Sequence, residues 1–363
     1  MRTLEKLTIK NFKSIREQTL ALGRLNVFIG GNGAGKSNLI EAFRFLRETI
    51  NQNLAEYTGT KGGADTLLYF GRKRSPEMSF FLEFGEGDTG NAYLVKLRGT
   101  DDDSLTIAEE TAYYHERKKY AKPYDKHVSS FSKESKLKTV DHICTRQVVR
   151  DLLSYRVYHF HDTSDTAAVK GTGDVDDNRV LRPQAENLAA FLYWMQQKMP
   201  DHFSNIQDTL RQIAPFFEDF RLAPSKLNES KIKLEWKEKG SDAYFNASSL
   251  SDGTLRFLCL ATLLMQPQLP AVVLLDEPEL GLHPAAVTLL ANLLASAATR
   301  TQVIVATQSV TLVNQFEQDA VWTVDREDNQ SVFRHLSGAD RRGVSHNNPR
   351  ARPKPVAPRP NDS

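Results

Sequence analysis

The spacing of hydrophobic residues near the N-terminus predicts strands that lead through a glycine-rich turn into a helix. Leu7 and Ile9 alternate with polar neighbours, and residues 25–29 form a compact apolar run that ends in glycines. Beyond the glycines, apolar residues return at helical spacing between 39 and 50. A period of two indicates a strand, and a spacing of three or four indicates a helix. We therefore expect a strand, a turn and a helix, in that order, within residues 25–50.

The second half of the chain alternates between apolar runs typical of buried strands and segments typical of helices. Residues 271–275 are continuously apolar, as expected of a strand covered on both faces of a parallel sheet. A strongly apolar helix is expected at 254–265, and a second helix is expected to start at Pro284. Further strands are predicted at 303–306 and 321–324. This alternation predicts an α/β fold with a mixed sheet.

Between these halves the pattern is weaker, and it divides the chain into expected units. Short strands with Gly and Asp turns follow the first helix, and two helices and a hairpin are expected after residue 183. We expect an antiparallel N-terminal subsheet and a helical lobe beside the mixed sheet. The expected units are an N-terminal lobe at 1–110, a basic and aromatic insertion with a connecting strand at 111–182, a helical lobe with a hairpin at 183–245, a C-terminal lobe at 246–336, and a disordered, basic, Pro-rich tail at 337–363.

The composition is that of an ordinary globular protein, and it excludes several classes. Of the 363 residues, 40% are hydrophobic and 25% are charged, which is enough apolar material to bury a core. No apolar run approaches the ~18–20 residues that cross a bilayer, and the first residues lack the apolar region of a secretory signal. Cys144 and Cys259 provide neither a disulfide framework nor a zinc site. We expect a cytoplasmic protein without a membrane partner.

Charge is distributed unevenly along the chain. The formal net charge is +2, but residues 341–363 hold six Lys and Arg against one Asp, so this end carries +5 and the rest carries −3. The segment 111–138 also carries +5 among several tyrosines. Such a mixture can bind the phosphates and bases of DNA, or it can form a solvated arm whose Lys stems cover apolar surface. No recognised nucleic-acid motif accompanies it, which favours the solvated arm.

One glycine-rich segment matches a phosphate-binding motif at every position. Residues 30–37 read Gly-Gly-Asn-Gly-Ala-Gly-Lys-Ser and fit G-x-x-x-x-G-K-[ST] after a strand and before a helix. The amides of such a loop point at phosphate oxygens, Lys36 reaches the β- and γ-phosphates, and Ser37 binds Mg²⁺. The alternative is an ordinary Gly-rich turn, and the spacing and context together argue against it. The predicted nucleotide-binding residues are Gly30, Asn32, Gly33, Ala34, Gly35, Lys36, Ser37 and Asn38.

Two carboxylates after the apolar strand at 271–275 supply the expected second half of the site. The strand delivers Asp276 to its carboxyl end, where ligands bind in open α/β sheets. Asp276 suits Mg²⁺, directly or through water. Glu277 points differently and suits general-base activation of the attacking water. The alternative is a strand that ends in two solvated carboxylates.

Three further segments resemble those of the RecF/SMC-like ATPases, which have ABC-type heads. Residues 250–254, Leu-Ser-Asp-Gly-Thr, look like the ABC signature. Residues 276–284, Asp-Glu-Pro-Glu-Leu-Gly-Leu-His-Pro, look like the Walker B and D-loop run, and residues 9–14 are similar to the opening strand and turn. The resemblance covers both ends of residues 1–336 and leaves 86–245 unmatched. It implies a P-loop NTPase fold of the ABC/RecF-like type, with Mg²⁺-dependent hydrolysis of ATP.

The resemblance also implies a homodimer with composite ATP sites, in which two heads sandwich two ATP molecules. The helix that follows the signature would present its positive end to a γ-phosphate held by the other copy. A capped helix start is the alternative for this segment, and we expect Asp252 to turn away as the cap. The facing residues would be Lys36, Ser37, Asp276 and Glu277 from one copy and Ser251 and Gly253 from the other.

Two departures from the family pattern concern catalysis and coupling. Gln308 stands where many relatives have a histidine that polarises the γ-phosphate. A glutamine can orient water or donate to phosphate but cannot take a proton, so we expect a catalytic Gln308 with slow turnover. No glutamine lies between Gln52 and Gln147, so the Q-loop residue cannot be placed. The run 159–162, His-Phe-His-Asp, is interpreted as a strand-end cluster, because no further metal ligand accompanies it.

Three functional classes remain open on the sequence. In the first, ATP-driven dimerisation of heads acts on DNA in repair or maintenance. In the second, the ATPase regulates a separate effector protein, as in a phage-defence or toxin-like system. In the third, the chain is the nucleotide-binding subunit of a transporter. The third fits worst, because the 111–138 segment and the missing Q-loop glutamine suit docking onto a membrane partner poorly.

Overall fold

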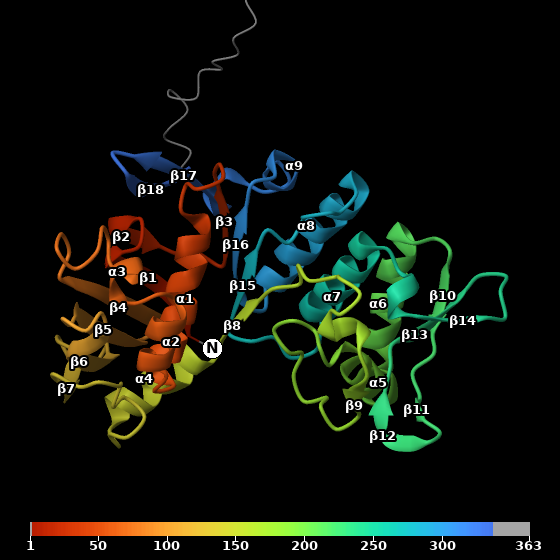
Figure 1. Ribbon diagram of the computed structural model, residues 1–363, viewed down its shortest axis with the longest axis horizontal. Coiled ribbons are helices and arrows are strands. Elements are labelled where there is room, and N and C mark those ends of the chain that lie inside the picture. Colours follow the sequence, from red (N-terminus) through yellow and green to blue (C-terminus); the bar gives the residue numbers. More distant parts are fainter. Residues whose placement is uncertain (1, 337–363) are drawn as a thin grey trace, which may run out of the picture.

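Two six-stranded sheets of different character frame the protein in the computed structural model, which describes residues 2–336. One sheet is antiparallel and the other is mostly parallel, and helices pack between them and beyond (Figure 1). The tail predicted at 337–363 lies outside the described residues. The expected fold class is confirmed: an α/β fold with a mixed sheet, an antiparallel N-terminal subsheet and a helical lobe.

The antiparallel sheet is built from the N-terminal part of the chain. Buried and half-buried residues alternate along its central strands, so one face enters the core. The basic and aromatic segment belongs to this sheet, because β6 crosses position 110, where a unit boundary was expected. In spatial order the strands are β2 (Ile15–Ala21), β1 (Thr3–Phe12), β4 (Glu77–Glu86), β5 (Thr89–Gly99), β6 (Leu105–Glu116) and β7 (Tyr124–Ser129).

The second sheet is parallel except for its last hairpin. Its apolar central strands are almost fully buried, as their continuous hydrophobic runs require. The carboxyl ends of β3, β16 and β15 lie side by side at one edge, because Thr307 pairs with Ile29 and Asp276 with Ala306. In spatial order the strands are β18 (Gln330–His335), β17 (Val321–Glu327), β3 (Leu25–Ile29), β16 (Gln302–Thr307), β15 (Val272–Asp276) and β8 (Tyr155–Tyr158).

Helix α1 (Lys36–Ile50) lies between the two sheets and organises the first core. One face of the parallel sheet, with Leu274 and Ile304, joins the same apolar cluster as the buried side of the antiparallel sheet. The Phe45 ring of α1 packs 5.5 Å from that of Phe80 in β4. Three helices flank this core: α2 (Leu54–Thr60), α3 (Ala64–Leu67) and α4 (Ile143–Leu153).

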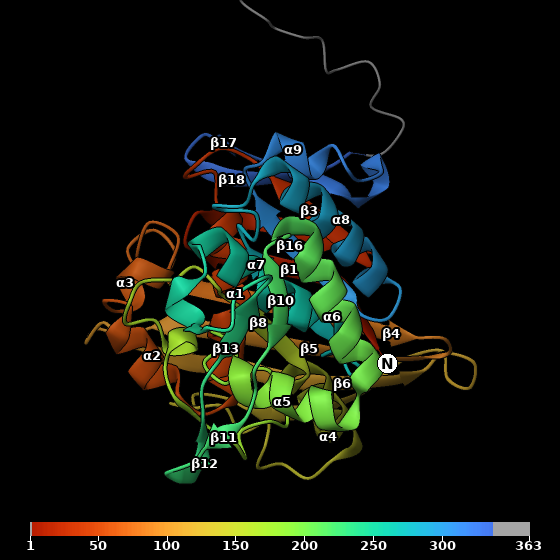
Figure 2. The ribbon, with the colours of Figure 1, turned by 90° about the vertical axis from the view of Figure 1, so that its right-hand side faces the viewer.

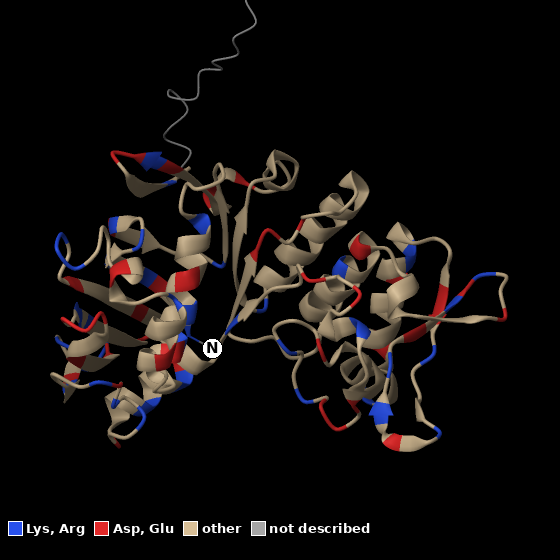
Figure 3. Cartoon of the chain, viewed as in Figure 1, with Lys and Arg blue, Asp and Glu red and all other residues tan. Residues whose placement is uncertain are grey.

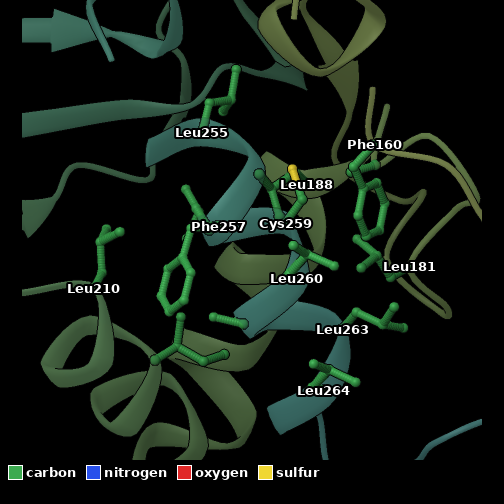
Figure 4. Close-up of a cluster of buried hydrophobic side chains, with 14 of the residues drawn as sticks. Phe160, Leu181, Leu188, Leu210, Leu255, Phe257, Cys259, Leu260, Leu263 and Leu264 are labelled. Carbon is green, nitrogen blue, oxygen red and sulfur yellow. The ribbon is translucent and has the colours of Figure 1, made fainter. Parts of the chain in front are cut away.

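The opposite face of the parallel sheet packs against a second core centred on α7 (Asp252–Met265). Val273 and Val303 contribute from the sheet, and α7 is apolar on nearly every side because it is surrounded (Figure 4). Cys259 lies in this core, where burial raises the pKa of its thiol to about 12. The neighbouring helices are α8 (Pro284–Ala298), α5 (Leu188–Lys198) and α6 (Pro200–Ile213), and α9 (Val310–Val313) follows β16.

The helical lobe carries two small sheets instead of one hairpin, and α5 and α6 face the viewer in Figure 2. Within the described residues, no helix is both long and apolar enough to span a membrane. One small sheet is β10 (Phe217–Phe220), β13 (Glu235–Glu238) and β14 (Tyr244–Asn246), and the other is β11 (Pro224–Ser225), β12 (Asn228–Ile232) and β9 (Gly173–Asp174). Short 3₁₀ turns occupy Ala168–Lys170, Ala247–Ser249 and Gln318–Ala320.

Candidate functional site

The glycine-rich loop wraps around the ammonium group of Lys36. The loop connects β3 to α1, and Lys36 is the first residue of the helix. Its Nζ donates to the carbonyl oxygens of Gly30 at 2.8 Å and Gly31 at 3.0 Å, and the side chain is only 4% exposed. A cation at the centre of a loop of backbone dipoles suits a bound phosphate chain.

Two of the loop glycines are required by close packing. A Cβ on Gly30 would collide with the carbonyl oxygen of Val324 in β17. Gly35 has a φ of +114°, and a Cβ there would collide with the hydroxyl of Ser331 in β18. The motif therefore needs glycine at these two positions because neighbouring strands press against the loop.

The back of the loop is braced by three polar side chains. Ser331 Oγ donates to the Ala34 carbonyl at 2.6 Å and lies 2.6 Å from Ser14 Oγ. The side-chain amide of Asn38 donates to Ser14 Oγ at 2.6 Å. Asn38, which we predicted to bind nucleotide, thus has its amide engaged in supporting the loop.

The exposed side of the loop leaves room for a ligand. No side chain caps the N-terminus of α1, and within residues 2–336 the amides of Lys36 and Ser37 have no hydrogen-bond partner. The amides of Asn38 and Leu39 donate to the Gly35 carbonyl. Asn32 and Gly33 are exposed, and there is open space beside Gly33. Ala34 is buried, and its amide donates to the Gly31 carbonyl at 3.2 Å. An anion would therefore meet free amide groups and the helix dipole together.

The side chains of Asp276 and Ser37 can provide two oxygen ligands for a metal ion beside the loop. The Ser37 hydroxyl lies beside the Asp276 carboxylate, and Oδ1 of Asp276 is buried without a hydrogen-bond partner among the described residues. Burial raises the pKa of Asp276, while Ser37 and the more distant Lys36 act in the opposite direction. A buried carboxylate oxygen with no donor, next to a hydroxyl, fits the hard oxygen coordination of Mg²⁺.

Glu277 follows in a conformation that is unusual for its residue type. Its φ is +42°, which is the left-handed region, and its amide donates to the Ala306 carbonyl at 2.7 Å. The Glu277 carboxylate contacts the residue after β16, because Gln308 Nε2 donates to Glu277 Oε2 at 3.4 Å. Backbone strain of about 1–3 kcal/mol at such a residue is typical of functional sites.

Two residues that the sequence did not single out as site residues stand next to these carboxylates. The Glu279 side chain is buried, accepts a hydrogen bond from the Thr307 hydroxyl, and has a pKa raised by burial. Its second oxygen, Oε2, has no partner within the described residues. His161 Nε2 contacts the backbone carbonyl of Asp276 at 2.6 Å, so the histidine run lies against the candidate metal site.

The signature segment forms the start of α7, with one correction to our expectation. Ser251, and not Asp252, caps the helix, because Ser251 Oγ accepts a hydrogen bond from the Thr254 amide at 3.2 Å. Asp252 is exposed, and its carboxylate lies 3.9 Å from Lys170 Nζ. A Cβ on Gly253 would lie 2.6 Å from the carbonyl oxygen of Gly281, so the start of α7 packs on the loop after β15.

The structure thus gathers most of the predicted residues at one edge of the parallel sheet. Lys36, Ser37, Asp276 and Gln308 come from the carboxyl ends of three adjacent strands. Across residues 2–336, no hydrogen bond or ion pair joins Ser251 or the amide of the signature glycine to the glycine-rich loop. Ser251 is instead exposed on the surface.

An open cavity of about 1220 Å³ adjoins the glycine-rich loop. Ser14 and Asn38 belong both to its wall and to the support of the loop. Its wall also carries the half-exposed ring of Phe70 and the cationic side chains of Arg72 and Arg326. A cavity of this size holds a ligand as large as a nucleotide.

Comparison with known proteins places the fold and the family. A crystal structure described as the SmcHead bound to the C-winged helix domain of ScpA matches with a TM-score of 0.60 at 16% identity, covering 93% of this chain and 98% of that one. A Pyrococcus furiosus Smc head domain with an extended coiled coil, bound to the C-terminal domain of ScpA, matches with a TM-score of 0.57 at 15% identity, covering 92% and 96%. These similarities show an SMC-head fold. Residues 25–314 match a family described as "AAA domain, putative AbiEii toxin, Type IV TA system", and the chain belongs to this family.

Proposed function

We propose that the protein is a Mg²⁺-dependent ATPase whose site lies at the carboxyl ends of β3, β15 and β16. The observation that carries the proposal is the meeting of a cationic phosphate loop with a buried, unpartnered carboxylate oxygen on Asp276. Asp276 and Ser37 would hold Mg²⁺, and the metal would neutralise charge on the β- and γ-phosphates. The family match and the SMC-head fold support the same class of activity.

Side chains of the protein would bind the phosphates, accept the proton and orient the attacking water. Lys36 would exchange its two loop carbonyls for phosphate oxygens, while the free amides of the loop orient the phosphate chain. Glu277, whose carboxylate accepts a hydrogen bond from Gln308, would accept a proton from the attacking water. Gln308 contacts Glu277 and would orient that water, but it has no titratable proton, so we expect slow turnover.

We place the base and ribose of the nucleotide in the open cavity beside the loop. The cavity shares Ser14 and Asn38 with the support of the loop, so it lies next to the loop. The ring of Phe70 offers a surface for stacking, and the guanidinium of Arg74 lies 4.8 Å from the centre of that ring.

A second copy of the chain would complete each site. Ser251 and Gly253 stand at the exposed positive end of α7, which is 14 residues long. Within one copy they contact the loop after β15 and not the glycine-rich loop, so we propose that they meet the γ-phosphate held by a partner copy. Bound ATP would then hold two copies together as a homodimer, and hydrolysis of the ATP would let the two copies separate.

Regulation of a separate effector protein is the cellular role that the observations favour. The family description names a toxin of a type IV toxin–antitoxin system, and the Smc heads of similar fold are described as bound to ScpA, which is a protein partner. The alternative, an ATPase that acts on DNA, would need a free basic surface. Near the tip of the β6–β7 hairpin, Arg117, Lys118 and Lys119 instead pair with carboxylates at 2.6–2.7 Å. Figure 3 shows both signs of charge interspersed along the antiparallel sheet.

The direct test of the ATPase proposal is the substitution Lys36→Ala. Phosphate release from ATP should fall to the background rate, because the loop loses the cation that neutralises the transferred phosphoryl group. The matched control is Lys231→Ala, which removes a cation from β12 in a small sheet of the helical lobe and leaves both the loop and the cavity unchanged. Equal phosphate release by the Lys36→Ala variant and the unmodified protein would refute the proposal.

A further inference from the structure

The helical lobe leaves the sheet directly beside the candidate metal site. β8 pairs in parallel with β15, and Tyr158 lies opposite Leu275 in the register. The residues that follow Tyr158 therefore emerge at the same edge as Asp276, which follows Leu275. A coupling residue is most useful at this position, because the segment that leads from the sheet into the helical lobe begins here. The glutamine that the family resemblance assigns to such coupling has no match in the sequence.

His161 makes a direct contact with the metal-site strand. Its Nε2 lies 2.6 Å from the backbone carbonyl oxygen of Asp276. Because a carbonyl oxygen can only accept, Nε2 carries the proton and donates the hydrogen bond. The contact fixes the peptide plane between Asp276 and Glu277, which is the peptide that leads into the left-handed turn at Glu277.

The ring of His161 is held in place by a second histidine. The two imidazoles stack with centroids 4.3 Å apart and an angle of 19° between the rings. His159 is itself anchored, because its amide donates to the Pro183 carbonyl at 2.9 Å. Burial lowers the pKa of His159 to about 4, with smaller contributions from His161 and Arg44, so the stacking partner is uncharged at neutral pH.

The backbone of the same segment is tied to the signature helix by Arg256 of α7. This guanidinium is buried, with 7% of the residue exposed. Its Nε donates to the carbonyl of Phe160 at 3.0 Å, its Nη2 donates to that of His161 at 3.1 Å, and its Nη1 donates to that of Leu280. A movement of α7 therefore reaches the Phe160–His161 segment through two charge-assisted hydrogen bonds, and the third ties α7 to the loop after β15.

We infer that His161 is a positioning residue that couples the helical lobe to the metal site, in the role that the family resemblance gives to a glutamine. It would act by holding the Asp276–Glu277 peptide so that Asp276 Oδ1 faces the metal and Glu277 faces the water. The inference rests on the proposed ATPase function. It assigns the histidine run, which the sequence left as a strand-end cluster, a part in nucleotide sensing. Partners of this kind, which orient a metal ligand without touching the metal, typically contribute 10–100-fold to metal affinity or activity.

The test compares four forms of the full chain: the unmodified protein, His161→Leu, His161→Gln and His335→Leu. Leucine removes the donor, whereas glutamine keeps an N–H at a similar reach. His335 is the matched control, because its Nε2 also contacts a backbone carbonyl, that of Asp319 at 2.9 Å, but in β18 at the opposite edge of the same sheet. The measurement is thermal stabilisation by a non-hydrolysable ATP analogue, titrated with Mg²⁺ and repeated in EDTA.

We expect His161→Leu to raise the Mg²⁺ concentration for half-maximal stabilisation roughly 10-fold or more. Stabilisation by the analogue in EDTA should stay within about 2-fold, because the phosphate loop is untouched. His161→Gln and His335→Leu should titrate like the unmodified protein, and the rescue by glutamine separates positioning from simple loss of packing. A His161→Leu titration that matches that of His335→Leu overturns the inference.

The outcomes also separate this inference from the ATPase proposal. If the unmodified protein shows Mg²⁺-dependent stabilisation and phosphate release but His161→Leu changes neither, only the coupling role fails. If the unmodified protein binds the analogue with Mg²⁺ but releases no phosphate, the ATPase proposal fails while the titration still decides the role of His161. Should His161→Leu not fold, His161→Asn replaces it, because the shorter amide is polar but does not reach the carbonyl, and the same shift is expected.

Discussion

One carboxylate oxygen of Asp276, Oδ1, is buried without a hydrogen-bond partner in residues 2–336, so replacing this residue should stabilise the protein. The substitution Asp276→Asn keeps the size of the side chain and an oxygen acceptor for Ser37, and it removes the charge. An unpartnered buried acceptor that carries a charge costs at least about 1–3 kcal/mol, and Asp276 Oδ1 has no partner in the described part of the chain. We expect the free energy of unfolding to rise by about 1 kcal/mol, which corresponds to roughly 1–2 °C in Tm for a chain of this length.

The dependence on pH has a definite sign. Burial raises the pKa of Asp276, so the folded protein holds the proton more tightly than the unfolded chain does. Ionised Asp276 therefore opposes folding near neutral pH, and this cost disappears as the pH falls below the ordinary aspartate pKa of about 3.9. The difference in Tm between Asp276→Asn and the unmodified protein should be largest near pH 7 and should shrink toward pH 4. Thermal unfolding without nucleotide, scanned over pH, measures it.

A gain in stability at this position should come with a loss of metal binding. With a non-hydrolysable ATP analogue, the Mg²⁺-dependent part of the stabilisation should vanish in Asp276→Asn. Asp242→Asn is the control, because the Asp242 side chain is fully exposed. This substitution should change the free energy of unfolding by less than about 0.5 kcal/mol. A Tm for Asp276→Asn that equals or falls below that of the unmodified protein at pH 7 would refute the argument.

The remaining predictions concern dimerisation, the loop and DNA. Glu277→Gln should slow hydrolysis while ATP still binds, so light scattering should detect an ATP-dependent dimer; a monomer at high protein concentration contradicts the composite site. Gly35→Ala should cost about 2 kcal/mol or more in chemical unfolding, because of its positive φ and the collision with a β18 hydroxyl, whereas Gly31→Ala, with open space, should cost less than about 0.5 kcal/mol. Lys118→Ala with Lys119→Ala should leave any salt-dependent DNA binding unchanged, since both cations are already paired; a clear loss would restore the DNA-acting interpretation.

The sequence predicted the parts of the fold in which local pattern and tertiary packing agree. The run at 271–275 is continuously apolar, and the strand it predicted is covered on both faces. The motif at 30–37 combines spacing with context, and its two tightest glycines are explained by the strands behind them. The segment 111–138 was harder, because its first residues, with Tyr113 and Tyr114, lie on β6 beside β5, while its Lys and Arg residues begin in the turn after β6. Composition cannot distinguish a solvated arm from the edge of a sheet.

Contacts between segments that are far apart along the chain could not be predicted from the sequence. His161 approaches Asp276 from 115 positions away, and only the parallel pairing of β8 with β15 brings them together. Ser251 and Asp252 are both good helix caps, so the choice between them depends on the backbone at the start of α7. Glu279 lies in a run whose other acidic members were assigned, but its burial against Thr307 is decided by β16.

The pairing of β8 with β15 has a consequence for how this architecture can vary. The chain departs from β8, builds the whole helical lobe, and returns through β15, so the two crossing points are adjacent strands. An excursion whose ends are neighbours can be lengthened, shortened or exchanged without altering the order of the strands, since closing a longer loop costs only about 0.6 kcal/mol for each doubling of its length. The helical lobe can therefore vary in length and structure while the parallel sheet stays the same. An effector protein that binds this lobe would act directly on β15, the strand that carries Asp276 of the candidate site, and on its neighbour β8.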